Sequence, residues 1–132
     1  MIGLDTNVLV RYLAQDDARQ AALANRLIDN ELSASRPGFI SLVVLAELCW
    51  VLKRLYGASG AELIKTVKDL LGLPQCHVER REVVQGAIGR AKSARAGFID
   101  ALIAETAAAD GCLHTLTFDK VAARTVGMKL LA

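Results

Sequence analysis

The chain has 132 residues and a formal net charge of +2, and 53% of its residues are hydrophobic while only 5% are aromatic. This length fits one domain with one aliphatic core, and no apolar run is long enough to span a bilayer. The mild positive charge permits a nucleic-acid partner without requiring one. Because the N-terminus lacks the basic region and cleavage site of a signal peptide, we expect a cytoplasmic protein.

The three cysteines are odd in number and lie far apart in the sequence. Cys49 and Cys112 lie in apolar runs, where a thiol acts as a small hydrophobic group, so we predict that both are core residues. Two histidines, His77 and His114, lie near Cys76 and Cys112. A structural zinc site needs paired ligands at close, repeated spacing, which is absent here, so we expect no zinc.

The N-terminal segment combines an apolar run with polar residues that stop it. Residues 2–4 are apolar or glycine, Asp5 ends the run, and apolar spacing resumes after Asn7. This pattern predicts a buried strand that delivers Asp5 at its carboxyl end, with Thr6 or Asn7 capping the helix that follows. In open α/β sheets, ligands bind at the carboxyl ends of the strands. Asp5 therefore stands where chemistry is usually done.

Two helices are predicted after this strand. The first runs to about residue 14, and Asp16 or Asp17 then caps a second helix that runs to about residue 32. The residues of the second helix that we expect to face inward are Leu23, Leu27 and Ile28. Turn residues predict a loop over 33–38.

Strands and helices alternate along the rest of the chain. In order, we predict a strand at 39–40, a helix at 42–55 capped by Ser41, a helix at 61–71 capped by Ser59, and a strand at 76–78. The next elements are a helix over 79–95, an interruption at 96–97, a helix over 98–109, a strand over 112–116, and a short helix before a last strand near 128–131. This alternation implies a parallel sheet covered on both faces, the α/β class. Since no repeat or linker interrupts it, we expect a single domain over residues 1–132.

Four acids occupy unusual positions in this pattern. Asp5 and Asp119 follow predicted strands, and Glu47 and Asp100 each interrupt an apolar helix. A buried carboxylate costs several kcal/mol or more unless it is paired, hydrogen-bonded or bound to metal. If all four meet at one end of the sheet, a divalent metal would balance their charge, and oxygen ligands favour Mg²⁺ or Mn²⁺ over zinc. The alternative is that Asp5 and Asp119 cap helices while Glu47 and Asp100 lie on exposed edges.

Other polar residues close in sequence to these acids are secondary candidates. Each one alone is more simply a helix cap, but together they would orient the carboxylates. They are Thr6, Asn7, Ser41 and Thr117. Basic residues that would bind flanking phosphates, or otherwise lie on ordinary solvated helix faces, are Arg11, Arg80, Arg81, Arg90, Lys92, Arg95 and Lys120.

Four segments together resemble a PIN domain, and more narrowly a VapC-type toxin ribonuclease of a type II toxin-antitoxin system. The segments read LDTNVL at 4–9, IS followed by VLAEL at 40–41 and 44–48, FIDALIA at 98–104, and LTFDK at 116–120. They occur in family order and span nearly the whole chain. The resemblance implies a three-layer α/β/α domain with a central, mainly parallel sheet.

The resemblance also implies an activity and its residues. The expected function is a Mg²⁺- or Mn²⁺-dependent endoribonuclease that leaves 5′-phosphate and 3′-hydroxyl ends, with an RNA substrate, a cognate antitoxin protein and a homodimeric state. Its catalytic and metal-binding acids would be Asp5, Glu47, Asp100 and Asp119. Many relatives carry a further Asp where this chain has Gly97, which leaves the number of metal ions open.

Two functions of other classes compete with this interpretation. Asp5 would be the nucleophile of a haloacid-dehalogenase-like phosphotransferase, but those enzymes usually carry a second Asp two residues later, where this chain has Asn7. The second competing function is that of a catalytically silent PIN-like module that binds RNA or protein. Retention of all four acids argues against it, because a silent module has little need of them.

Overall fold

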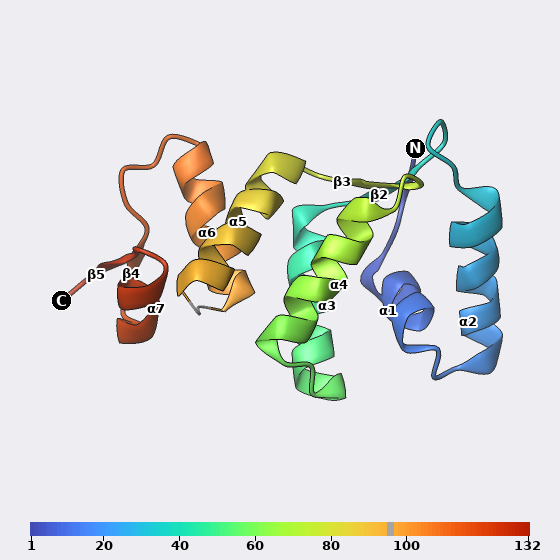
Figure 1. Ribbon diagram of the computed structural model, residues 1–132, viewed down its shortest axis with the longest axis horizontal. Coiled ribbons are helices and arrows are strands. Elements are labelled where there is room, and N and C mark those ends of the chain that lie inside the picture. The colour runs from blue at the N-terminus through green and yellow to red at the C-terminus, as the bar shows by residue number, and fades with distance from the viewer. Residues whose placement is uncertain (95–96) are drawn as a thin grey trace. The chain divides into compact units, whose positions relative to one another are not determined.

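The computed structural model describes residues 1–94 and 97–132, and it divides into two compact units, unit 1 (Met1–Glu79) and unit 2 (Arg80–Ala132). Figure 1 shows that each unit combines helices with short strands, which confirms the predicted mixed α/β class. Arg95 and Ala96, which the sequence placed in a helix end and an interruption, lie outside the described residues. In the described part of the chain, no helix is long and apolar enough to cross a membrane.

Unit 1 contains a parallel three-stranded sheet in the order β1-β2-β3. Its strands are β1 (Ile2–Gly3), β2 (Gly38–Ile40) and β3 (Cys76–Val78). The helical segments between them are α1 (Thr6–Ala14), α2 (Ala18–Asn25), the π-helical η1 (Arg26–Glu31), α3 (Leu42–Tyr56) and α4 (Gly60–Gly72). Because both strand-to-strand connections run in the same direction across the sheet, right-handed crossovers place these helices on one face.

Local capping chemistry starts and ends these helices. Ser41 and Ser59 are the N-caps of α3 and α4, as the sequence predicted, and Asp17, one of the two predicted candidates, is the N-cap of α2. Gly57 ends α3 with a φ of 66°. The predicted start of α1 is wrong by one residue. Asp5 is its N-cap and accepts a hydrogen bond from the Thr6 backbone N–H at 2.8 Å, whereas Thr6 already lies in the helix and is buried.

The core of unit 1 corrects two further predictions. Ile28 is fully buried, but Leu23 is 57% exposed although helical spacing predicted it to face inward. The small residues Ala21 and Ala24 take the buried positions of α2 instead. Ile2 is 51% exposed, so β1 is not the buried strand that the apolar run predicted, because β1 is an edge strand of this sheet.

Unit 2 contains α5 (Arg81–Ala94), α6 (Phe98–Ala109) and a two-stranded parallel sheet of β4 (Leu116–Thr117) and β5 (Lys129–Leu130), connected by α7 (Lys120–Thr125). Helix α6 has the predicted bounds. The strand predicted over 112–116 is wrong, since only Leu116 belongs to a strand. Cys112 is exposed rather than a core thiol, because the chain leaves α6 through a turn at Gly111, whose φ is 91°.

The Arg90 side chain holds the parts of unit 2 together. Its Nη2 atom lies 2.9 Å from Glu105 Oε1 on α6, and its Nη1 atom donates to the Val126 carbonyl oxygen at 2.6 Å, just after α7. Arg90 therefore connects α5, α6 and the end of α7.

Candidate active site

Polar side chains gather at the carboxyl edge of the three-stranded sheet. The Leu4 N–H donates to the Phe39 carbonyl at 2.9 Å, and the next residue, Asp5, begins α1. Ser41 follows the neighbouring strand and caps α3 through Val44 N at 3.1 Å. Parallel strands bring these strand exits to the same edge, as the sequence pattern predicted.

Asp5 and Glu47 line the same pocket, which has a volume of about 320 Å³. Asp5 reaches it from the start of α1, and Glu47 reaches it from α3. The other residues that line it are Thr6, Asn7, Val10, Arg11, Val51, Leu55 and Tyr56. Tertiary packing thus brings together two of the four predicted acids, although 42 positions separate them in the sequence.

Thr6 connects these two acids. Its backbone N–H donates to Asp5 Oδ1, and its side-chain hydroxyl donates to Glu47 Oε1. The Thr6 side chain is 5% exposed, so this hydroxyl is fixed in its surroundings and orients the Glu47 carboxylate. Glu47 itself is exposed, which agrees with the alternative, left open by the sequence, that it lies on an exposed edge.

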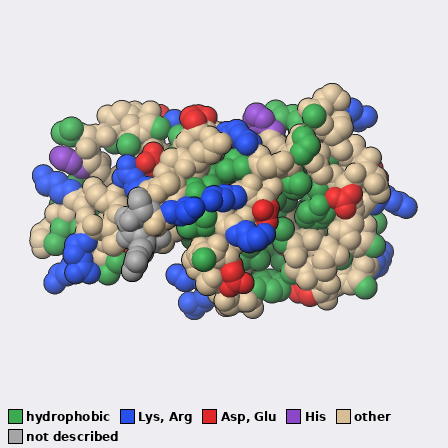
Figure 2. Space-filling view, in the orientation of Figure 1, with side chains coloured by type: hydrophobic (Ala, Val, Ile, Leu, Met, Phe, Trp, Pro, Cys, Tyr) green, Lys and Arg blue, Asp and Glu red, His purple; other side chains and the backbone are tan. Residues whose placement is uncertain are grey.

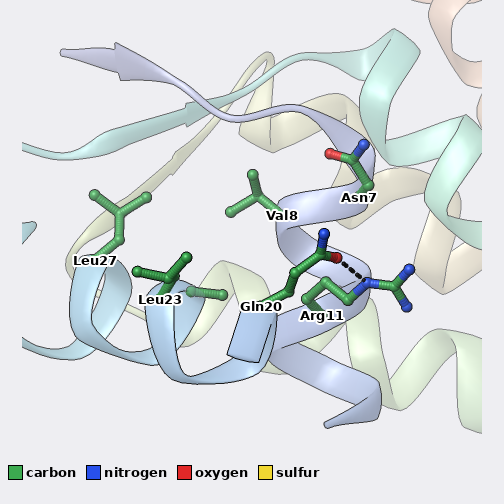
Figure 3. Close-up of a pocket in the computed structure, with 7 residues that line it drawn as sticks. Asn7, Val8, Arg11, Gln20, Leu23 and Leu27 are labelled. Atoms are coloured by element: carbon green, nitrogen blue, oxygen red, sulfur yellow. Dashed lines mark hydrogen bonds between the residues drawn. The ribbon is translucent and has the colours of Figure 1, made fainter. Parts of the chain in front are cut away.

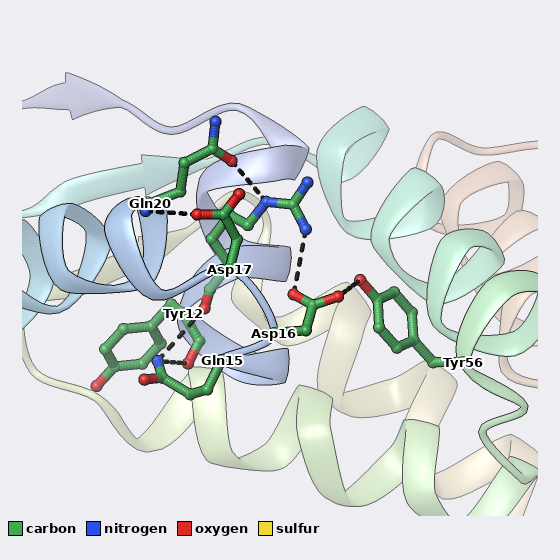
Figure 4. Close-up of polar contacts among 7 residues, drawn as sticks. Tyr12, Gln15, Asp16, Asp17, Gln20 and Tyr56 are labelled. Atoms are coloured by element: carbon green, nitrogen blue, oxygen red, sulfur yellow. Dashed lines mark hydrogen bonds and ion pairs between the residues drawn. The ribbon is translucent and has the colours of Figure 1, made fainter.

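Arg11 supplies a positive charge to the acid pocket. Its Nε donates to Gln20 Oε1 at 2.6 Å, and its Nη1 donates to Asp16 Oδ1 at 3.1 Å. The Tyr56 hydroxyl donates to the other oxygen of Asp16 at 2.6 Å, as Figure 4 shows. Several contacts hold the pKa of Asp16 below its usual value. The hydrogen bond from Tyr56 is the largest of these causes, and the hydrogen bond and charge of Arg11 are smaller ones. Asp16 therefore stays ionised and holds Arg11 in place.

A second, mostly apolar pocket lies beside the acid pocket, between α1 and α2, with a volume of about 270 Å³ (Figure 3). Val8, Leu23, Ala24 and Leu27 give it apolar walls, and its polar lining residues are Asn7, Arg11 and Gln20. Asn7 and Arg11 line both pockets. Since they are four residues apart on α1, they lie on one face of that helix.

The two remaining acids belong to unit 2. Asp100 lies half-buried in the first turn of α6, where its charge suits the positive end of the helix dipole. Asp119 is the N-cap of α7, and its Oδ1 accepts from the backbone N–H groups of Val121 and Ala122 at 2.8 and 3.1 Å. The Thr117 hydroxyl accepts from the Asp119 N–H at 3.0 Å, so it fixes the backbone that carries this carboxylate.

Gly97 marks the departure from the family pattern. A Cβ atom at this position would lie 3.9 Å from Asp100 Oδ2. A carboxylate carried on residue 97 would therefore stand beside Asp100. In this chain Asp100 has no such neighbour.

The donor atoms of the acid pocket suit a hard divalent cation. Asp5 and Glu47 offer carboxylate oxygens, and none of the described residues that line this pocket is Cys or His. Oxygen ligands favour Mg²⁺ or Mn²⁺ over zinc. Within either unit, over residues 1–94 and 97–132, no three His, Cys, Asp or Glu side chains gather closely enough to hold a metal ion. The pair in unit 1 therefore fits part of a coordination shell.

Three residues near this edge were absent from the sequence-based candidates. Glu79 follows β3, and its Oε1 accepts from the Leu42 N–H at 2.8 Å, so it helps to cap α3 together with Ser41. The rule that selected Asp5, an acid at a strand exit, would also have selected Glu79. Asp16 and Tyr56 carry no such signal, because they are 40 residues apart.

Lys and Arg side chains are spread over the face drawn in Figure 2, where Asp and Glu side chains also occur. Among the basic residues considered from the sequence, Arg11 lines the pocket that holds Asp5 and Glu47. The other basic candidates that the structure describes are not among its lining residues, and Arg95 lies outside the described part of the chain.

Comparison with known proteins identifies one family. The family model described as PIN domain matches residues 2–127, so the match extends through both units and includes all four acids. No curated protein matches the chain.

Proposed function

The chain belongs to the PIN-domain family, and from this membership we propose that it is a metal-dependent endoribonuclease that acts as the toxin of a type II toxin-antitoxin pair. Proteins of this family are generally metal-dependent nucleases. The single observation that carries the proposal is the pocket that Asp5 and Glu47 share, with the buried Thr6 hydroxyl between them. In this proposal activity depends on Asp5, Glu47, Asp100 and Asp119.

In unit 1, the Asp5 and Glu47 carboxylates would contribute ligands to Mg²⁺, for which Mn²⁺ would substitute. The chemistry that such an ion supplies when bound is neutralisation of phosphate charge and a lower pKa for a coordinated water molecule. Hydrolysis by water needs no 2′-hydroxyl, so the expected RNA products carry 5′-phosphate and 3′-hydroxyl ends.

The residues of the chain would position these carboxylates. Asp5 is fixed by its bond to the Thr6 N–H, which leaves Oδ2 without a partner among the described residues. Thr6 orients Glu47, and Thr117 fixes the backbone at Asp119. Asn7 is exposed at the rim of the same pocket, within reach of a substrate. Ser41 acts through the start of α3, the helix that carries Glu47.

The proposed partners are RNA as substrate, a cognate antitoxin protein as inhibitor, and a second copy of the chain, in the cytoplasm. Unit 1 offers surface for a protein partner. Val43, Trp50 and Leu55 on α3 are 79%, 54% and 70% exposed. Exposed apolar side chains that gather on one element are typical of interaction surfaces.

The test of this function is cleavage of a labelled RNA panel by the purified, partner-free protein with Mg²⁺, with Mn²⁺ and with EDTA. We expect cleavage with either metal, none with EDTA, and none in Asp5→Asn, which controls for contaminating nuclease. End-group analysis should find 5′-phosphates. Products with 2′,3′-cyclic phosphates would exclude this route.

One observation favours the catalytically silent module as a second candidate. Asp5 and Asp119 both cap helices, Asp100 lies in the first turn of α6, and Glu47 is exposed, so each of the four acids has a local structural explanation. Calorimetric titration with Mn²⁺ separates the two functions. A nuclease should bind the ion and lose binding in Asp5→Asn, whereas a silent module should show no binding in either protein.

A further inference from the structure

We propose that Arg11 holds an RNA phosphate in the acid pocket, and that Asp16, Gln20 and Tyr56 position its guanidinium group for this purpose. This inference rests on the proposed ribonuclease function and deepens it. It assigns a specific substrate-binding residue, which the sequence left open among seven basic candidates.

The charge of the pocket requires a cation close to the substrate. A phosphodiester that approaches Asp5 and Glu47 meets two carboxylates of its own sign. Arg11 lines the same pocket and carries a permanent positive charge. Its planar guanidinium presents N–H donors in a fork that matches the two free oxygens of a phosphate group.

The hydrogen bonds of Arg11 leave part of its guanidinium available. Nε is bonded to Gln20 and Nη1 to Asp16, while Nη2 has no hydrogen-bond acceptor among the residues that the structure describes. The Arg11 side chain is 32% exposed, so a ligand in the pocket can reach it. Arg11 is therefore held at one edge and open at the other, and Figure 3 shows its contact with Gln20.

The partners of Arg11 are themselves fixed by separate elements. Asp17 caps α2 through the Gln20 N–H at 2.9 Å, which places Gln20 in the first turn of that helix. Tyr56, the last residue of α3, donates to Asp16 in the loop between α1 and α2. Because these contacts exist before substrate binds, little side-chain freedom remains to be lost on binding.

The location of Arg11 also suits an extended substrate. It lines the acid pocket and the neighbouring apolar pocket, so a phosphate held there would lie between the two. A single-stranded RNA could place the scissile phosphate near Asp5 and the adjoining nucleotide toward Val8 and Leu23. Arg11 would then act on a phosphate next to the reacting one, as a substrate-binding residue.

The experiment measures binding of a fluorescein-labelled, random-sequence single-stranded RNA by anisotropy in EDTA, over a series of salt concentrations. Arg11→Gln should raise Kd roughly tenfold and lower the slope of log Kd against log salt by about 0.7, as expected for one lost phosphate contact. Arg11→Lys keeps the charge but not the fork, and should recover the slope with a partial recovery of Kd. Circular dichroism on each variant confirms that the protein remains folded.

Two variants separate a phosphate contact from a general loss of charge. Arg19→Gln removes one positive charge from an exposed position of α2 outside both pockets, and should change Kd less than about twofold. Tyr56→Phe keeps the net charge and removes one hydrogen bond that orients Asp16. It should raise Kd about threefold without changing the salt slope.

The outcomes distinguish this inference from the function on which it rests. If the wild-type protein binds and cleaves RNA but Arg11→Gln behaves like Arg19→Gln, the role of Arg11 is wrong and the ribonuclease remains. If the wild-type protein neither binds nor cleaves any RNA, the proposed function fails and the inference fails with it. With Mg²⁺ present, Arg11→Gln should raise KM more than it lowers kcat, since it removes binding rather than chemistry.

Discussion

In unit 1, Asp5 and Glu47 line one pocket and are connected through the buried Thr6 hydroxyl, whereas in unit 2 Asp100 and Asp119 are each explained by the helix that follows or contains them. The acids of the two units are therefore held differently, by a long-range contact in unit 1 and by the local helix in unit 2. Glu47 is oriented by a contact over 41 residues, and Asp119 is held by backbone N–H groups within three residues.

A single Asp residue can both cap a helix and serve as a catalytic group. A cap uses one carboxylate oxygen, Oδ1 in both Asp5 and Asp119, and leaves the other oxygen for a different ligand. The amide of Asn also accepts a hydrogen bond at an N-cap, but it carries no charge. Asp-to-Asn substitutions therefore separate the two roles in either unit.

The largest effect is expected for Asp5→Asn. Because Asn keeps the cap, the free energy of unfolding should change by less than about 0.5 kcal/mol. Loss of a charged metal ligand should lower kcat/KM roughly a thousandfold, which corresponds to about 4 kcal/mol. Initial cleavage rates and chemical denaturation on the same preparation check both values. An active Asp5→Asn protein would leave Asp5 with its capping role alone.

A loss of roughly a hundredfold in cleavage rate is expected for Asp119→Asn and for Asp100→Asn, with little change in stability. Asp119→Ala should in addition lower the free energy of unfolding by about 1 kcal/mol, because it removes the N-cap of α7. Single-turnover rates with saturating Mg²⁺ provide the measurement. Full activity in both Asn variants would confine the function to the acids of unit 1.

The contact between Thr6 and Glu47 is tested by Thr6→Val, which removes the hydroxyl and keeps the shape of the side chain. We expect the Mg²⁺ concentration for half-maximal cleavage to rise roughly tenfold, because Glu47 loses the group that orients it. Thr66→Val, at a half-buried position of α4 outside the acid pocket, is the matched control. Equal behaviour of the two variants would show that the Thr6 hydroxyl has no role in activity.

Breaking one ion pair in each unit shows how much each pair contributes to the free energy of unfolding. Arg90→Met breaks a partly buried pair with Glu105 and a bond to the Val126 carbonyl, so the free energy of unfolding should fall by about 2 kcal/mol. Lys65→Met breaks the exposed Lys65–Asp69 pair and should cost about 0.3 kcal/mol. Urea denaturation measures both. Similar costs would mean that Arg90 does not hold unit 2 together.

The smallest effect is a pH dependence in unit 1. The Tyr12 hydroxyl donates to Asp29 at 2.7 Å, and this hydrogen bond is the main cause that raises the pKa of Tyr12 from 10.0 to about 12. Because the pKa of Tyr12 is higher in the folded state than in the unfolded state, the stabilisation by this hydrogen bond is complete below pH 10. It is lost as the pH rises toward 12. Thermal unfolding from pH 9 upward should therefore show a steeper alkaline decline in wild type than in Tyr12→Phe. Parallel declines would contradict this assignment.

Local sequence patterns predict the helices of both units and most of their ends. Helix α6 has its predicted bounds, Ser41 and Ser59 are caps where predicted, and Asp17 is one of the two caps predicted for α2. Helical spacing and capping depend on residues within about four positions of one another, so this information is local. The same local rules selected the four acids as unusual, and the family match covers all four.

The folded arrangement of the elements sets which of these residues face one another and which reach solvent. It exposed Leu23, which helical spacing had placed inside, and Cys112, which an apolar run had placed inside, and for Glu47 it selected the exposed position that the sequence had left open as an alternative. It also brought Tyr56 to Asp16 and Thr6 to Glu47, pairs that are 40 and 41 residues apart. Side chains so distant in sequence meet only when the strands and helices between them pack together, and periodicity along one helix does not record that packing.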